Sequence, residues 1–445
     1  MDGKIISKRY YKIEFRLASA LSIGGNASYT TDKDIVYNGK GVPYIPATSL
    51  TGVYRSFFDD EKANNYFGNS GLNNFTESKI YVYDAEMKND DYTVSRRDCV
   101  GLDEWKTSIK GAKFDFEIIE PEAEFVTYIE QDIYETTVGD KTTVDENVAD
   151  FLADMWCENK IRIGGKTARG LGGVKNVSVK MKSFSFKDDD EKSKWLDFDI
   201  FDDNDWSDSI VWNGANDDKQ HWEYSLKDDK IILKLSMKQD SPITVRTYTT
   251  DVSGADYRQL TLKKYFINGK KEENVAVIPG TSWAGAFRHH IEKLGICKND
   301  DTKGVNVIDD VFGYCSEGKS KKSSIYFSES IIHGGDSKTF SRNSIDRFTG
   351  GTVENALFTE EVYYGGETTL QIEFDRPRSA EFLKSMAMAV ADLHGGFISV
   401  GGETSIGHGI FRLKSIKCND KDIVVTDNLE ELYENVVSKL FEEKR

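Results

Sequence analysis

Hydrophobic and polar residues alternate in two stretches that lie far apart in the chain, at 11–18 and 231–237. A period of two is typical of a strand with one buried face, so each stretch predicts a β-strand. Each strand is followed by a loop, a proline-containing turn and a segment that predicts a helix. Further strands are expected at 80–84 and 325–328, later helices at about 147–157 and 379–393, and a closing strand after each of two glycine-rich loops.

The two halves share this order because the chain contains a long internal repeat. Four segments of the first half return in the same order in the second: 45–55 as 278–288, 66–68 as 311–313, 78–87 as 323–332, and 163–173 as 400–410. Strands and helices mixed in this order predict an α+β fold, with two tandem ferredoxin-like domains as the natural candidate. We expect these parts: a first domain at 1–186, an acidic segment at 187–229, a second domain at 230–425 and an amphipathic C-terminal helix at 426–445.

Charge is distributed unevenly along the chain. The 445 residues carry a net charge of −17 and are 38% hydrophobic, which excludes collagen-like, disulfide-scaffold and wholly disordered classes. The segment 187–229 has 15 acidic and 5 basic residues, more than half of that net charge, and holds four of the seven tryptophans. Two interpretations stay open for it: a flexible acidic linker, or a folded insertion that docks on a neighbouring subunit.

Cysteine spacing and hydropathy indicate a cytoplasmic protein. The five cysteines are far apart and form no C-x-x-C pair, so we expect reduced thiols and no zinc site made from them. The six histidines also lack metal-binding spacing. No apolar run of about 18 residues predicts a membrane span, and the N-terminus lacks the pattern of a signal peptide.

The repeated I-P-x-T-S-x-x-G-x-x-R elements are candidate anion sites. Thr48 and Ser49, and likewise Thr281 and Ser282, are suitable N-caps, and free N–H groups at a helix start bind phosphate. An arginine follows in each copy and could add a charge-assisted contact; His289, next in the chain, could also contact RNA. The alternative is packing between strand and helix, with each arginine bridging to a carboxylate and the histidine on a solvated face. The two arginines are Arg55 and Arg288.

The glycine-rich loops are candidate sites for a sugar-phosphate backbone. Each precedes a strand, so neither is a Rossmann or P-loop signature, which requires a following helix. Bare backbone N–H groups with Arg162, Lys166 and Arg169 alongside would suit phosphate in the first copy. The second copy has Glu403 and Ile406 instead, so weaker binding is expected there. The alternative is a tight turn that requires positive φ. The glycines concerned are Gly164, Gly165 and Gly170, and then Gly401 and Gly402.

Two polar loops carry candidate catalytic carboxylates. Asp32 and Asp34 lie in the first copy, and Asp251 and Asp256 in the second. A carboxylate in such a loop could hold a divalent cation or position an attacking hydroxyl. Aspartate is common in loops, which leaves a purely structural role as the alternative. No Ser/His/Asp, Walker or H-E-x-x-H constellation is present in the sequence.

Taken together, these residues resemble the RAMP superfamily, in particular the backbone subunits of type III CRISPR effector complexes. The resemblance rests on the two elements above and on NSIDRFTGGTVENALFTEEVYYGG at 343–366, which is similar to the thumb of that family, with Asp346-Arg347 and Glu361-Val362 in order. The first copy has a degenerate version that starts at Arg96 and has Glu117 in the place of Glu361. Two fused copies most resemble the double-domain subunit of type III-D systems.

The resemblance implies tandem ferredoxin-like domains, related to RNA-recognition motifs, with thumb insertions. The glycine loops and helix-start arginines would hold CRISPR RNA, and thumbs, here with Arg342 and Arg347, would kink the guide–target duplex. A loop aspartate would support cleavage of target RNA with a divalent cation, Mg²⁺ or Mn²⁺. Asp32 fits the D-x-x-[VI] pattern of the family as a metal ligand, whereas Asp256 and then Asp251 fit less well.

The implied partners are CRISPR RNA, target RNA and other type III subunits, including the large polymerase-like subunit, and no membrane. The sequence leaves two alternatives to this nuclease. One is a scaffold of the same family without catalysis, in which the aspartates only shape their loops. The other is an endoribonuclease that processes CRISPR RNA, for which His408 beside the second glycine loop is the candidate catalytic histidine.

Overall fold

The computed structural model describes the ranges 3–25, 31–71, 74–103, 107–138, 141–212, 230–248, 254–267, 270–297, 307–316, 319–376 and 378–442. The chain divides into two compact units. Unit 1 comprises Met1–Ser95, Phe116–Gly165 and Gly172–Leu226. Unit 2 comprises Arg96–Asp115, Lys166–Leu171 and Lys227–Arg445, so two short segments from the first half of the sequence belong to it.

Unit 1 is built on an antiparallel sheet with a ferredoxin-like topology. Its four principal strands lie in the spatial order β10, β1, β8, β4. In the sequence, a helical segment separates the first of these strands from the second, and another separates the third from the fourth. This is the β-α-β-β-α-β arrangement expected from the repeat. The bounds are β1 (Gly3–Leu17), β4 (Ile80–Val82), β8 (Glu124–Val138) and β10 (Val174–Ser185).

Three helices pack on one face of this sheet. They are α1 (Ala47–Arg55), α2 (Asp60–Phe67) and α3 (Val148–Cys157). Because side chains alternate along a strand, Tyr11, Ile13 and Phe15 of β1 all point into the core beneath them. The buried indole of Trp156 on α3 donates to the hydroxyl of Tyr54 on α1, 3.0 Å away, which ties the two helices together.

The acidic segment folds over the opposite face of the same sheet. Residues 189–211 form α4 (Asp189–Asp197), the 3-10 helix η2 (Asp203–Trp206) and β11 (Ile210–Val211), which pairs with β10. Trp206, 1% exposed, lies in a small core with Tyr10, Tyr128 and Phe184 of the sheet. Part of the segment is therefore a folded cover on the chain's own sheet, while residues 213–229 lie outside the described ranges.

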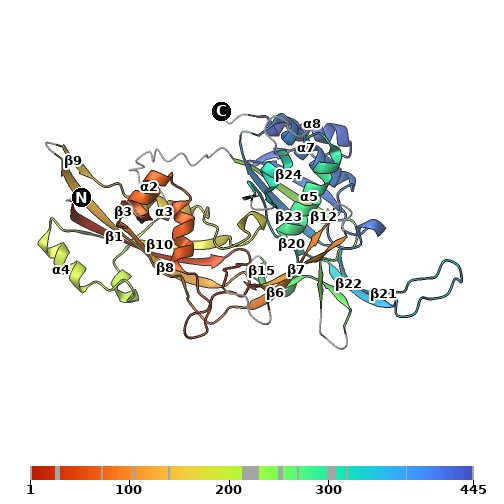
Figure 1. Cartoon of the computed structure of the whole chain (residues 1–445), viewed down its shortest axis with the longest axis horizontal. Helices are drawn as coiled ribbons and strands as arrows, with labels where there is room; N and C mark the ends of the chain where they lie inside the picture. Colours follow the sequence, from red (N-terminus) through yellow and green to blue (C-terminus); the bar gives the residue numbers. More distant parts are fainter. Residues whose placement is uncertain are drawn as a thin grey trace. The chain divides into compact units, whose positions relative to one another are not determined.

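Unit 2 repeats the topology with a larger sheet (Figure 1). Its strands lie in the order β15, β16, β20, β23, β12, β24, β25, and β19 also pairs with β23. Helices α5, α6, α7 and α8 contribute to its core. The bounds are β12 (Lys230–Gln239), β15 (Thr261–Ile267), β16 (Lys270–Ile278), β19 (Ile325–Phe327), β20 (Ser330–His333), β23 (Glu367–Asp375), β24 (Phe411–Cys418), β25 (Lys421–Ile423), α5 (Gly280–Leu294), α6 (Val307–Phe312), α7 (Ala380–Gly395) and α8 (Leu429–Leu440).

A second sheet in unit 2 carries a long hairpin. Strands β21 (Asp336–Arg342) and β22 (Phe358–Tyr364) are antiparallel, and β22 also pairs in parallel with β14 (Tyr257–Gln259), which pairs with β13 (Arg246–Tyr248). Figure 1 shows the hairpin reaching out beyond the other strands of the unit. We call residues 336–364 the thumb hairpin, because they overlap the segment in which a thumb is expected.

Short strands and 3-10 turns complete the described structure. They are β2 (Asn69–Gly71), β3 (Asn74–Thr76), β5 (Glu86–Met87), β6 (Val94–Leu102), β7 (Ser108–Ile119), β9 (Lys141–Val144), β17 (Tyr314–Ser316), β18 (Lys319–Lys321), η1 (Thr167–Arg169) and η3 (Thr404–Ile406). The α+β class and the tandem ferredoxin-like architecture are thus confirmed. In the described ranges, no helix is long and apolar enough to cross a membrane.

The predicted N-caps are wrong by two to three residues. Helix α1 starts at Ala47 with Pro46 as its N-cap, and α5 starts at Gly280 with Pro279 as its N-cap, so the Thr-Ser pairs lie inside the first turn. The reason is that each proline holds the extended conformation of an N-cap, with φ near −60°. In α1 the carboxylate of Asp84 caps the helix instead, accepting from the N–H of Ala47 at 2.6 Å.

Candidate functional site

The two glycine-rich loops have the same backbone conformation. Lys166 and Glu403, each directly after the first two glycines, lie in the left-handed region with φ of 56° and 54°, and a 3-10 turn follows in each loop. At Gly172 and Gly409, φ is 76° and 77°, and a Cβ at either position would collide with the carbonyl of Ile163 or Val400. The expectation that these loops are tight turns requiring positive φ is therefore met in both copies.

The first glycines of each loop bind the protein's own backbone. The N–H of Gly165 donates to the carbonyl of Ser22 at 2.8 Å, and the N–H of Gly402 donates to that of Thr244 at 2.7 Å. Gly164 and Gly401, both at positive φ, lie against the same two carbonyls. These contacts hold each loop to the segment that follows the first strand of its domain. Because both N–H groups already donate to a carbonyl of the protein, the geometry does not favour the prediction that they bind phosphate.

Arg169, predicted to contact RNA, is a structural residue of unit 2. Its guanidinium donates to the hydroxyl of Ser323 at 3.1 Å, the carbonyl of Ile325 at 3.3 Å and the carbonyl of Phe312 at 2.9 Å. Burial, together with the positive charge of Arg288, lowers the pKa of Arg169. A Cβ on Gly170, at φ 90°, would collide with the backbone at Glu329. The loop 166–171 therefore packs against other residues of unit 2 at Arg169 and Gly170.

Lys166 differs from Arg169 in being exposed. Its ammonium lies 4.5 Å from the ring centroid of Phe114, a cation–π contact within unit 2. Such a contact orients the side chain and leaves its charge at the surface. Of Lys166 and Arg169, Lys166 is thus the exposed residue, and a contact between its ammonium and phosphate stays a prediction.

The two helix-start arginines have equivalent structural partners. Arg55 donates to the carbonyl of Gly68 at 2.9 Å and Arg288 to that of Gly313 at 3.0 Å, and these glycines end α2 and α6 in the two copies. Arg288 also pairs with Asp309 and with Glu292, as the alternative interpretation of these arginines expected. Arg55 binds the carbonyl of Ala63 and the amide of Asn64 as well. Each guanidinium thus joins two helices, and binding of RNA by either one stays a prediction.

The remaining helix-start residues are partly accessible. Thr48 and Thr281 are exposed, Ser49 and Ser282 are half-buried, and His289 is half-buried on α5. The neighbouring His290 is held by Asp392 on α7, with 2.6 Å between the ring nitrogen and the carboxylate. This pair ties α5 to α7.

The loop with Asp32 and Asp34 lies beside the first glycine loop in unit 1. Asp32 is exposed, whereas Asp34 is half-buried and accepts a hydrogen bond from the hydroxyl of Thr31. The exposed Lys33 between them approaches Gly24, and its ammonium would contact a Cβ on Gly165. The structure therefore brings a carboxylate loop, a lysine and the glycine loop together. Lys33 was missed in the sequence, where only its place between two aspartates marks it.

The second pair of aspartates is placed differently. The carboxylate of Asp256 accepts from the N–H of Thr359 at 2.8 Å, and its own N–H donates to the carbonyl of Thr359, also at 2.8 Å. Asp256 thus fastens the start of β14 to the thumb hairpin, which favours a structural role. Asp251 lies outside the described residues.

The thumb hairpin carries one accessible and one anchored arginine. Arg347 is exposed in a turn that begins at Asp346. The carboxylate of Asp346 accepts from the N–H groups of Thr349 and Phe348, and these hydrogen bonds lower its pKa. Phe348 is 98% exposed. Arg342, at the base of the hairpin, is held by the carboxylate of Glu403.

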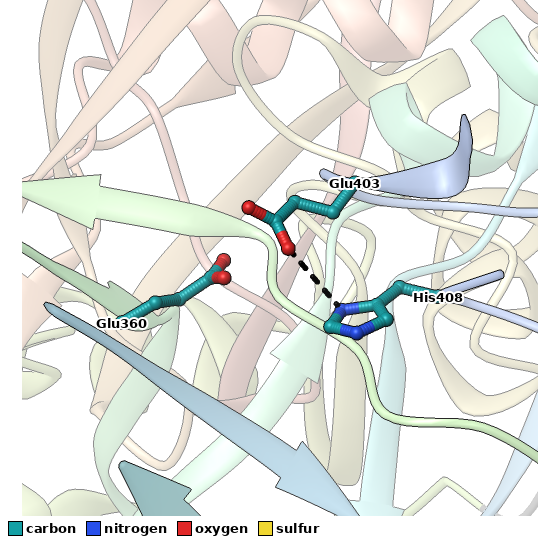
Figure 2. Close-up of side chains that lie close together, drawn as sticks. All are labelled: Glu360, Glu403 and His408. Carbon is teal, nitrogen blue, oxygen red and sulfur yellow. Dashed lines mark ion pairs between the residues drawn. The ribbon is translucent and has the colours of Figure 1, made fainter. Parts of the chain in front are cut away.

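A buried polar cluster, missed in the sequence, lies where the thumb hairpin meets the second glycine loop (Figure 2). Glu360 of β22, Glu403 and His408 have ligand atoms that all lie within 4.8 Å of one another. No motif spacing marks the three, because strand register and loop conformation bring Glu360 to the loop. His408 is only 7% exposed, which opposes its predicted role as a catalytic histidine acting on RNA.

Two repeated ferredoxin-like units with matched glycine loops define a tandem α+β protein. The sequence model of the RAMP superfamily matches residues 14–175 and 260–412. Because these matches cover most of the chain and fall one in each half, the protein belongs to the RAMP superfamily.

Comparison with solved structures finds a chain from a cryo-EM structure of the type III-B Cmr-beta complex bound to cognate target RNA. The two chains are 17% identical, and the TM-score is 0.30. The match covers 39% of this chain and 61% of that chain. No curated protein matches.

Proposed function

We propose that this protein is an RNA-binding backbone subunit of a type III CRISPR effector complex. The observation that carries the proposal is membership of the RAMP superfamily in both halves of one chain. The thumb hairpin of unit 2 supports it, since an exposed arginine and an exposed phenylalanine at its turn suit contact with phosphate and with bases. In this role the protein recognises the shape and phosphates of a guide–target duplex and leaves sequence recognition to base pairing.

The RNA-contacting groups of the proposal are the accessible cations. Lys33 is exposed in the loop that carries Asp32, Lys166 is exposed within the first glycine loop, and Arg347 is exposed on the thumb hairpin. Arg55, Arg169, Arg288 and Arg342 all have protein partners, so they act by holding the elements in place. The other partners in the proposal are CRISPR RNA, target RNA and neighbouring subunits, among them the large polymerase-like subunit.

Cleavage of target RNA is the second part of the proposal, with Asp32 as the site. Mg²⁺ usually binds proteins through one or two carboxylates and completes its shell with waters and substrate phosphates. An exposed Asp32 carboxylate fits such a site, and Asp34, bonded to Thr31, would hold the loop in shape. A bound Mg²⁺ or Mn²⁺ would supply charge stabilisation and an activated nucleophile. Asp32 would be its protein ligand.

The assembly is tested by purifying the tagged protein from its host and sequencing any RNA bound to it. The proposal expects spacer-containing RNA of defined length together with other RAMP-like subunits. Recovery of the protein alone and free of RNA would refute it and leave the function open beyond the family.

Catalysis is tested in the assembled complex with Asp32→Asn, and Asp256→Asn is the matched control. We expect Asp32→Asn to abolish cleavage at one target site without loss of RNA binding, and Asp256→Asn to keep cleavage at that site. Unchanged cleavage at every site by Asp32→Asn would favour a scaffold without catalysis. Cleavage of repeat RNA by the lone protein in the presence of a chelator would instead indicate a processing nuclease.

A further inference from the structure

The cluster of Glu360, Glu403 and His408 contains a buried carboxyl group without a hydrogen-bond donor. Glu360 is 0% exposed, and neither of its carboxylate oxygens accepts a hydrogen bond. Its nearest cation is Arg246, whose Nε lies 3.7 Å from Oε1, beyond hydrogen-bond distance. A carboxylate that is removed from water and not hydrogen-bonded destabilises the folded state unless another group compensates. Such a side chain, aimed at two further ligand-type groups, indicates a site for a missing cation.

The other two members of the cluster are arranged to share that cation. Nδ1 of His408 lies 3.9 Å from Oε2 of Glu403 and makes no hydrogen bond (Figure 2). Two ligands of a metal with bonds of about 2.0–2.2 Å lie roughly 3–4 Å apart, so this pair already has a suitable separation. The carboxylate of Glu360 supplies the third donor, and all three donor atoms lie within 4.8 Å of one another.

We infer that Glu360, Glu403 and His408 form a binding site for a transition-metal dication, with Zn²⁺ as the best match. One imidazole nitrogen and two carboxylate oxygens are borderline-hard ligands that suit Zn²⁺ and Mn²⁺ rather than Ca²⁺ or Mg²⁺. Three protein ligands leave the fourth position of a tetrahedral zinc for water. Among the described residues, these three form the one group of histidine, cysteine, aspartate or glutamate side chains whose ligand atoms come close enough to share a metal ion.

Two arginines contact the proposed ligands, and a metal ion has to displace part of these contacts. Arg246 lies 3.1 Å from Glu403, and Arg342 contacts Glu403 and also Nε2 of His408, 3.3 Å away. Ligation through Nδ1 places the ring hydrogen on Nε2, so Arg342 has to release the ring and keep its bond to the carboxylate. Both guanidiniums are partly exposed, at 39% and 28%, and can turn toward solvent.

The site joins three separate segments of unit 2. Glu360 belongs to β22 of the thumb hairpin, Arg246 to β13, and Glu403 and His408 to the second glycine loop. The first copy has Lys166 where the second has Glu403, so the site belongs to the second copy alone. A bound dication would fix the base of the hairpin to the loop. This inference stands independently of the proposed RNA binding.

The test is metal binding by the full-length protein after treatment with a chelator. Zn²⁺ is titrated in competition with a chromophoric chelator, and Co²⁺ is used as a spectroscopic probe. We expect one site per chain, a Co²⁺ spectrum without the strong thiolate band that a cysteine site would give, and a rise in melting temperature with Zn²⁺. Glu360→Gln should weaken Zn²⁺ binding by more than about 100-fold, because changes outside the first coordination shell already weaken it about 10–100-fold.

The matched control is His290→Asn, which removes a histidine from a pair with one carboxylate, Asp392, and should leave Zn²⁺ binding unchanged. His408→Asn is a second test at the site in case Glu360→Gln does not fold. The inference is overturned if the wild-type protein binds no Zn²⁺ or Co²⁺, if Co²⁺ gives a thiolate band, or if both site variants bind Zn²⁺ as tightly as the wild type does. The inference is supported if the Glu360→Gln variant is more stable than the metal-free wild type and is no longer stabilised by Zn²⁺.

Discussion

At the scale of single residues, basic side chains of the repeat divide into those bonded inside a unit and those left at its surface. Arg55 is of the first kind, because its guanidinium satisfies the carbonyls of Ala63 and Gly68 around the end of α2. Arg347 is of the second kind, exposed in the turn of the thumb hairpin. Both were predicted to contact RNA, and their different surroundings separate the two roles experimentally.

We expect Arg55→Ala to lower the free energy of unfolding by about 1–3 kcal/mol, because buried carbonyls lose their donor. Urea denaturation of the purified protein measures this change. Arg347→Ala is the control and should leave stability within about 0.5 kcal/mol of the wild type while it weakens RNA binding. If the Arg55→Ala variant is as stable as the wild type but loses RNA binding, the structural role of Arg55 is contradicted.

We expect the protein to lose stability at alkaline pH because of two tyrosines in unit 1. Tyr10 and Tyr83 both donate to the carboxylate of Glu130. Burial, followed by smaller effects that include the charge of Glu130, raises the pKa of each hydroxyl to about 12. Because the unfolded value is about 10, their neutral forms stabilise the folded state fully below about pH 10. That contribution is lost as the pH rises through about 12.

Melting temperatures recorded between about pH 8 and pH 12 check this prediction. The wild type should lose more stability than Tyr83→Phe does between about pH 10 and pH 12, because phenylalanine has no proton to release. Parallel curves for the two proteins would show that Tyr83 does not contribute.

At the scale of elements, the segment from α4 to β11 closes the face of the first sheet that the helices leave open. Salt bridges join it to the sheet, with Lys12 to Asp203 and Lys182 to Asp208 both at 2.5 Å. The indole of Trp195 on α4 donates to the hydroxyl of Tyr10 at 2.7 Å. The surface that an RNA-recognition motif offers to bases is thus covered in unit 1 by acidic and aromatic residues of the same chain.

Trp206 should be the main anchor of this cover. We expect Trp206→Ala to lower the free energy of unfolding by about 3–5 kcal/mol, the usual effect of removing a large buried aromatic side chain. Phe201→Ala, from a 61% exposed residue of the same segment, is the control and should have a small effect. Denaturant titration of both variants measures the difference. Equal effects would mean that the segment does not pack on the sheet through Trp206.

At the scale of the whole molecule, the net charge of −17 opposes binding of RNA by the isolated chain. Three of the acidic residues, Asp189, Asp190 and Asp197, are exposed on α4. Replacing these three by asparagine should raise the affinity of the isolated protein for single-stranded RNA at low salt, because repulsion of phosphates decreases. Filter binding at increasing salt measures this effect. The gain should vanish at high salt, where exposed charges are screened, and a gain that persists would point to another cause.

The sequence alone determined the repeat, the α+β class, the ferredoxin-like order of elements and the bounds of α3 and α7 to within about two residues. These features follow from hydrophobic period and turn chemistry, which act between residues close together in the chain. Membership of the RAMP superfamily was also evident from motifs of this local kind, such as the glycine loops.

Only the tertiary structure decided what those residues contact. Arg55 and Arg288 have carbonyl partners at the ends of other helices, and Arg169 packs in unit 2 rather than lying open to RNA. The cover of the first sheet and the cluster around Glu360 also join segments that are distant in sequence. Such contacts depend on strand register and on how elements pack, and the period of a single segment carries no information about either.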